Sequence, residues 1–85
     1  MRIFHSEYFQ GELKEFLRKN PDYIKRIKKT LYFMEFDVRH PSLRLHKLSN
    51  MEFYSVSVDM KIRIIFRKDG DKLFLIKIGN HNEVY

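Results

Sequence analysis

Apolar and polar residues alternate along three successive runs in the second half of the sequence, and this alternation most restricts the possible fold. The runs are Glu52–Asp59, Lys61–Lys68 and Lys72–Gly79. A period of two residues places alternate side chains on opposite faces, so each run predicts a half-buried β-strand. Because only short segments separate the runs, the three strands are expected to form an antiparallel meander.

The first half of the sequence repeats its apolar residues with the helical period. A short apolar run, Arg2–His5, predicts a first strand, and Ser6 is a suitable N-cap for a helix after it. A second helix is expected to start at Asn20-Pro21, with Asn20 as its N-cap and Pro21 as its first residue. The apolar stripes are Phe9, Leu13, Phe16 and Leu17 in the first helix and Ile24, Ile27, Leu31, Met34 and Val38 in the second.

These elements together predict an α+β fold in one domain over residues 1–85. The N-terminal strand leads into a two-helix hairpin, which ends at His40-Pro41. Ser42–Asn50 is expected to be a connector to the three-strand meander, which forms one small sheet packed on the helices. The last residues, Asn80–Tyr85, are expected to form a polar tail that ends on an aromatic side chain.

The register of the last two strands determines which charges share a face. The buried sets are expected to be Ile62, Ile64 and Phe66 in the middle strand and Phe74, Ile76 and Ile78 in the third. These sets face the same side if Phe66 opposes Phe74, which requires the three-residue loop 69–71 rather than a two-residue Asp-Gly turn. Arg63 then lies directly opposite Lys77. Like charges in this position are destabilising, so either an anionic ligand or nearby carboxylates and solvent must offset them.

The charge balance agrees with an anionic partner. The chain has 17 Lys and Arg against 11 Asp and Glu, a formal charge of +6. RNA, DNA, an acidic protein segment or a membrane surface would each suit this charge. The chain has no cysteine, and it contains no apolar run near the roughly 20 residues of a membrane span. The start of the sequence does not resemble a signal peptide, so we expect a soluble cytoplasmic protein.

Two residues of the tail are candidates for chemistry. His81 directly follows the third strand, and histidine titrates near neutrality, which suits a general acid or base; alternatively, it is an inert residue of a polar tail. Tyr85 either stacks on a base or covers the edge of the core. Cleavage of RNA without a metal needs a base, an acid and cations near the phosphate, and His81, Arg63, Lys61 and Lys77 have the required chemistry. The histidines lack any recognised metal-ligand spacing, so we expect neither a metal nor another cofactor.

Several segments of the second half resemble the RelE/ParE superfamily of type II toxins, as does the order of elements. The segments are Leu45–Leu48, Tyr54–Val58, Ile62–Phe66 and Ile78–Tyr85. Within the superfamily, the sequence is most similar to the YafQ-like and YoeB-like mRNA interferases. The resemblance implies a RelE-like fold and an endoribonuclease that cuts mRNA on the ribosome. It also implies a cognate antitoxin that blocks the site, with DNA contacted only through the antitoxin complex.

The resemblance also implies roles for individual residues. Arg63 matches the arginine that binds the phosphate, His81 the general acid or base, and Tyr85 the terminal aromatic that orients the substrate. His46 matches a histidine in the connector of YafQ-like members, and Lys77 takes the place of an arginine. The catalytic candidates are therefore His81, Arg63, His46 and Tyr85, and the substrate-binding candidates are Lys77, Lys61, Lys47 and Arg67.

Some positions differ from the family pattern. Ser42, Lys61 and Ser57 stand where particular members carry an acidic residue, an aspartate and a histidine. The general base therefore remains open between His46, His81 and a lysine of lowered pKa. Two other functions share the fold: inhibition of DNA gyrase by a ParE-like toxin, and binding of RNA or antitoxin without catalysis. ParE-like chains usually lack the histidine-containing tail, so residues 79–85 favour the ribonuclease.

Overall fold

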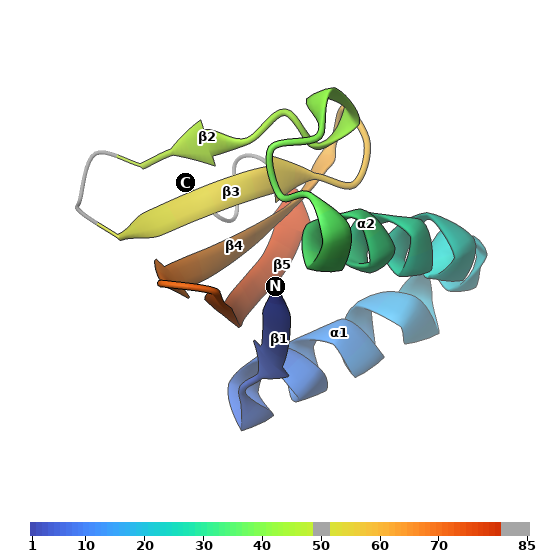
Figure 1. The fold of residues 1–85 in the computed structure, drawn as a ribbon. Coiled ribbons are helices and arrows are strands. Elements are labelled where there is room, and N and C mark those ends of the chain that lie inside the picture. Colours follow the sequence, from blue (N-terminus) through green and yellow to red (C-terminus); the bar gives the residue numbers. More distant parts are fainter. Residues whose placement is uncertain (49–51, 81–85) are drawn as a thin grey trace.

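The computed structural model describes residues 1–48 and 52–80. Figure 1 shows the N-terminal strand β1, a hairpin of two helices and then the remaining strands. The elements are β1 (Arg2–His5), α1 (Glu7–Lys19), α2 (Ile24–Phe36), β2 (His46–Lys47), β3 (Phe53–Ser57), β4 (Ile62–Asp69) and β5 (Lys72–Asn80), with 3-10 helices η1 (Pro21–Tyr23) and η2 (Pro41–Leu43). The predicted α+β fold is confirmed.

The strands form one sheet with the order β1-β5-β4-β3-β2. The predicted meander is present as β3, β4 and β5, and β1 joins its edge parallel to β5. Ser42–Asn50 was expected to be only a connector, and this is wrong because it contains the end of η2 and the short strand β2. A strand of two residues is too short to show an alternating pattern.

The start of α1 agrees with the sequence, whereas the start of α2 does not. The Ser6 hydroxyl accepts a hydrogen bond from the Phe9 amide at 3.0 Å, as an N-cap does. The prediction that Asn20 caps α2 is wrong, because its side-chain amide instead donates to the Phe16 carbonyl at 3.0 Å and closes α1. Pro21 begins the 3-10 turn η1, and α2 starts only at Ile24.

The core lies between the two helices and one face of the sheet. The predicted helical residues Phe9, Ile27 and Met34 are buried, but Ile24 is exposed. Val38 is buried too, but it lies outside α2, which ends at Phe36 and not at His40-Pro41 as predicted. In β4 the predicted set Ile62, Ile64 and Phe66 is also buried. In β5 the buried hydrophobic residues are Leu73, Leu75 and Ile78, so the prediction is right for Ile78 and wrong for Phe74 and Ile76. Within the described ranges, no helix has the length and apolar character needed to cross a membrane.

A β-bulge explains the error in β5. Asp69 pairs with Lys72, so the turn contains only Gly70 and Asp71, and Gly70 has the predicted positive φ, 60°. Glycine at the first of the two turn positions suits a type II′ turn. Phe66 therefore opposes Leu75, not Phe74.

The register then shifts by one residue between Phe66 and Ile65, which pairs with Lys77. Ile76 is the extra residue of the bulge. The prediction of a three-residue loop is therefore wrong. The one extra residue lies inside β5 and not in the turn. As a result Arg63 faces Gly79, and the predicted opposition of Arg63 and Lys77 is wrong.

Candidate nucleic-acid interface

The sheet has an outer face, which is the face turned away from the two helices. The pairing registers assign the side chains to this face. Among its members are Phe4, His46, Phe53, Ser55, Ser57, Arg63, Ile65, Arg67, Phe74 and Lys77. The face therefore combines cationic, hydroxyl and aromatic groups from all five strands, which is a composition that suits single-stranded nucleic acid.

Arg63 is held at a fixed position on the outer face by neutral oxygen atoms. Its Nε and Nη2 donate to the Ser55 hydroxyl at 3.2 and 3.0 Å, and Nη1 donates to the Ser57 hydroxyl at 2.8 Å. Nη2 also donates to the Arg44 carbonyl at 3.1 Å. Hydroxyl and carbonyl acceptors orient the planar guanidinium, whose fork of donors has the geometry that binds a phosphate or a carboxylate.

Arg44 contributes to the site through its backbone, and the sequence did not indicate it. It ends η2 with φ 47° and ψ 54°, in the left-handed region that few residues other than glycine adopt. This conformation accompanies the carbonyl contact to Arg63. A sequence signal would have required a glycine or asparagine at this position.

His46 lies on the same face as Arg63. It pairs with Ser55 across β2 and β3, and Ser55 in turn accepts hydrogen bonds from Arg63. The structure therefore brings together two residues that are 17 positions apart (63 − 46). Lys47 pairs with Tyr54 and points to the opposite face, so the structure does not place it with Arg63.

Arg67 and Lys77 share the outer face with Arg63 but have different surroundings. Lys77 pairs with Ile65, the outer-face residue next to Arg63 in β4. Arg67 lies 4.6 Å from the ring centre of Phe74 and forms a 3.7 Å ion pair with Glu52. Lys77 is thus the nearer of the two in register to Arg63, and Arg67 belongs to a cation–aromatic cluster further along β4.

Phe74 extends this cluster towards β1. Its ring stacks on Phe4 at 5.2 Å between centroids, and the Arg2 guanidinium lies 5.3 Å from the Phe4 ring centre. Aromatic rings with cations beside them are the groups on which unstacked bases bind.

Lys61 is not on the outer face. The sequence placed it in the middle strand, but β4 begins at Ile62, and Lys61 belongs to the turn that follows β3. Its amide donates to Asp59 Oδ1 at 2.9 Å, and its side chain is exposed. The side chain of the turn residue Asp59 accepts hydrogen bonds from backbone amides that would otherwise pair in the strand ladder.

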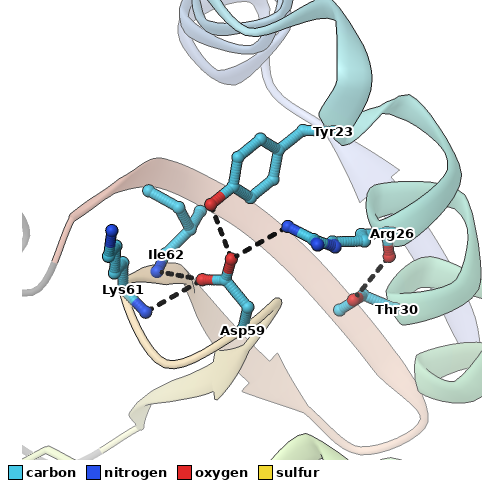
Figure 2. A network of polar contacts seen from close by, with 6 residues as sticks. All are labelled: Tyr23, Arg26, Thr30, Asp59, Lys61 and Ile62. Atoms are coloured by element: carbon cyan, nitrogen blue, oxygen red, sulfur yellow. Dashed lines mark hydrogen bonds and ion pairs between the residues drawn. The ribbon is translucent and has the colours of Figure 1, made fainter.

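Asp59 is the centre of a polar network that fastens this turn to α2 (Figure 2). The Tyr23 hydroxyl donates to Asp59 Oδ2 at 2.5 Å, and Arg26 Nη1 is 3.4 Å from the same oxygen. The amides of Lys61 and Ile62 donate to Oδ1 at 2.9 and 2.8 Å.

These contacts change two pKa values. Partial burial acts to raise the pKa of Asp59, but hydrogen bonds from Tyr23 and from the Ile62 and Lys61 amides outweigh it, so the pKa is lowered. The hydrogen bond to Asp59 raises the pKa of Tyr23. An aspartate just before a strand indicates a turn, but nothing in the sequence links it to Tyr23.

His81 and Tyr85 lie outside the described residues, so their predicted roles remain predictions. The described chain ends at Asn80, which pairs with Ile62, the neighbour of Arg63 in β4. Within residues 1–48 and 52–80, no three His, Asp or Glu side chains are grouped so that they could hold a metal ion.

No protein-family model and no curated protein matches the sequence. Solved structures match the fold over the whole chain. YafQ from E. coli strain BL21(DE3) has a TM-score of 0.82 at 14% identity, covering 100% of this chain and 99% of that chain. A metal-bound toxin from Helicobacter pylori has a TM-score of 0.80 at 22% identity, with the same coverage. A chain of the E. coli DinJ–YafQ toxin–antitoxin complex has a TM-score of 0.81 at 15% identity, covering 98% and 94%. The chain therefore has the fold of the RelE/ParE superfamily toxins, in its YafQ-like form.

Proposed function

We propose that this protein is the toxin of a type II toxin–antitoxin system and that it inhibits translation by cutting mRNA without a metal ion. The observation that carries the proposal is Arg63, which is oriented on the outer face by two hydroxyls and a carbonyl. The planar fork of donors in a guanidinium matches the oxygen atoms of a phosphate, which supports binding of the RNA backbone at Arg63.

The proposed reaction uses the RNA's own 2′-hydroxyl as the nucleophile. A general base removes its proton, the 2′-oxygen bonds to phosphorus, and the bond from phosphorus to the 5′-oxygen breaks. A general acid protonates the departing 5′-oxygen, which leaves a 2′,3′-cyclic phosphate and a 5′-hydroxyl. Arg63 stabilises the charge that develops on the phosphate oxygens in the transition state.

The imidazoles of His46 and His81 are the candidate base and acid. His46 supports this assignment by its place on the outer face, across Ser55 from Arg63. His81 is the residue after Asn80 in the sequence, and Asn80 pairs with Ile62 at the start of β4. Tyr85 is proposed to orient the substrate, and Lys77 to bind a neighbouring phosphate.

The proposed partners are mRNA on the ribosome and a cognate antitoxin. E. coli YafQ, which shares the fold, has been solved in a toxin–antitoxin complex with DinJ. The formal charge of +6 favours an antitoxin segment that is acidic where it covers the outer face. Contact with DNA is expected only through the antitoxin.

Primer extension on cellular mRNA during induced expression tests this function. The wild-type chain should arrest growth and produce discrete new 5′ ends, and Arg63→Ala should abolish both. Arg39→Ala is the matched control, because this arginine is exposed and follows α2. Growth arrest with intact mRNA, filamentation and damaged DNA would instead identify a gyrase inhibitor.

A further inference from the structure

A groove lined by cationic, hydroxyl and apolar side chains lies between α2 and the turn that joins β3 to β4. Its volume is about 560 Å³. Three cationic side chains line it, Arg26 and Lys29 from α2 and Lys61 from the turn, together with the hydroxyl residues Ser42 and Ser57. Figure 2 shows Arg26 and the turn on facing sides of this region. The groove thus combines cations with hydrogen-bonding groups, as polyanion sites do.

The groove continues to the Arg63 site. A smaller hollow of about 190 Å³ shares Ser42, Ser57 and Asp59 with the groove and extends it to Arg44. Ser57 belongs to both sites, because it lines the groove and its hydroxyl accepts the 2.8 Å hydrogen bond from Arg63. Arg44 likewise contacts Arg63 through its carbonyl. A strand of RNA bound at Arg63 therefore has a continuous path into the groove.

The charge of the groove is only partly cancelled by the described residues that line it. The one carboxylate among them, Asp59, accepts hydrogen bonds from Tyr23 and two backbone amides and lies 3.4 Å from Arg26. Among the ion pairs within residues 1–48 and 52–80, neither Lys29 nor Lys61 takes part. Three cations against one carboxylate give this described lining a net positive charge.

We infer that this groove is a second RNA subsite, which binds a backbone phosphate flanking the one held at Arg63. Lys29 and Lys61 contact the phosphate from opposite sides of the groove. Arg26 interacts with both the phosphate and Asp59. The inference rests on the proposed function. It adds that the substrate is a single strand long enough to reach from the outer face to α2. It also gives Arg26, Lys29 and Lys61 a role that the outer face does not.

Binding of single-stranded RNA to the double variant K29Q/K61Q tests the subsite. Arg26 is left unchanged because it contacts Asp59. The matched control is K25Q/K28Q, which removes the same charge from exposed positions of the same helix that do not line the groove. The probes are a 2′-O-methyl oligouridylate of about 12 nucleotides, which resists cleavage, and a dinucleotide that is too short to span both sites.

Loss of the one phosphate that the groove neutralises should reduce the slope of log K against log salt by about 0.7, which corresponds to about fivefold weaker binding of the long probe near 0.1 M salt. The control variant should lose much less, and the dinucleotide should bind all three proteins alike. Circular dichroism and the single variants K29Q and K61Q show whether the fold is retained; each single variant should give about half the change in slope.

Two results would overturn the inference separately from the proposed function. If the wild type cuts RNA and K29Q/K61Q binds the long probe as well as K25Q/K28Q does, the groove is not a subsite and the ribonuclease stands. If K29Q/K61Q weakens only binding of an acidic antitoxin peptide, the groove belongs to the protein partner. If the wild type neither binds nor cuts RNA, both proposals fail.

Discussion

Arg63 shows how a strand can present a charge in one orientation. Its three nitrogen atoms reach two serine hydroxyls of β3 and the Arg44 carbonyl. A guanidinium has donors in a rigid planar fork, and a lysine ammonium does not. The orientation of the charge, and not only its sign, is therefore expected to matter for cleavage.

Replacing Arg63 with lysine tests this expectation. R63K keeps the charge but loses the fork, so kcat/KM for RNA cleavage should fall at least about tenfold. S55A/S57A should lower kcat while RNA affinity changes little, because the guanidinium keeps its charge and loses its supports. Steady-state kinetics on the purified proteins separates the two parameters. Full activity of R63K would show that orientation is unimportant.

The Tyr23–Asp59 contact is expected to make stability depend on pH at both extremes. The folded state lowers the pKa of Asp59, so its stabilisation is present above the unfolded value of 3.8 and is lost as the pH falls through the folded value. The folded state raises the pKa of Tyr23, so its stabilisation is present below 10.0 and is lost as the pH rises through the folded value.

D59N should therefore lower the free energy of unfolding by about 1 to 2 kcal/mol near neutral pH, and the difference from wild type should vanish in acid. Y23F should cost about 1 kcal/mol near neutral pH, with a difference that shrinks in strong base. Urea unfolding at a series of pH values measures both. A D59N difference that persists unchanged in acid would mean that the carboxylate charge does not stabilise the turn.

At the scale of elements, periodicity predicts the helices and the meander, because their buried faces repeat over several turns or residue pairs. It does not predict β2, whose two residues carry no repeat. It also does not locate the one-residue shift in the pairing register between β4 and β5. A loop of three residues and a bulge at Ile76 both keep Ile78 on the buried face, so the alternation of apolar residues cannot distinguish them.

The bulge is accompanied by a contact from α1. The Ile78 amide donates to Glu12 Oε1 at 2.6 Å, next to the extra residue Ile76. A carboxylate acceptor here satisfies a backbone donor of a half-buried strand segment, which would otherwise have to be hydrated.

E12A should lower the free energy of unfolding by about 1 to 2 kcal/mol, and E12Q by roughly half as much, because glutamine keeps an acceptor without the charge. Urea denaturation measures the difference, with E35A as a control at an exposed glutamate of α2. A stability for E12A equal to that of the control would show that water replaces the carboxylate at no cost.

For the whole molecule, the sequence predicts the positions of single candidate residues better than their surroundings. Arg63 and His46 lie on one face of the sheet because of the pairing of β2, β3 and β4. Lys47 and Lys61 lie elsewhere, since their faces depend on strand ends that the pattern places only approximately. Arg44 and Asp59 act through contacts across 19 and 36 positions, and local sequence carries no signal of them.

The most direct measurement is cleavage of an RNA with one 2′-hydroxyl in an otherwise 2′-O-methyl strand, by the purified protein with a chelator present. The wild type should cut only after the unmodified nucleotide and leave a 2′,3′-cyclic phosphate. R63A should be slower by about a hundredfold or more, and R39A should be unchanged. Cleavage that needs a metal ion, that proceeds without the 2′-hydroxyl, or that is as fast in R63A as in R39A would contradict a 2′-hydroxyl reaction directed by Arg63.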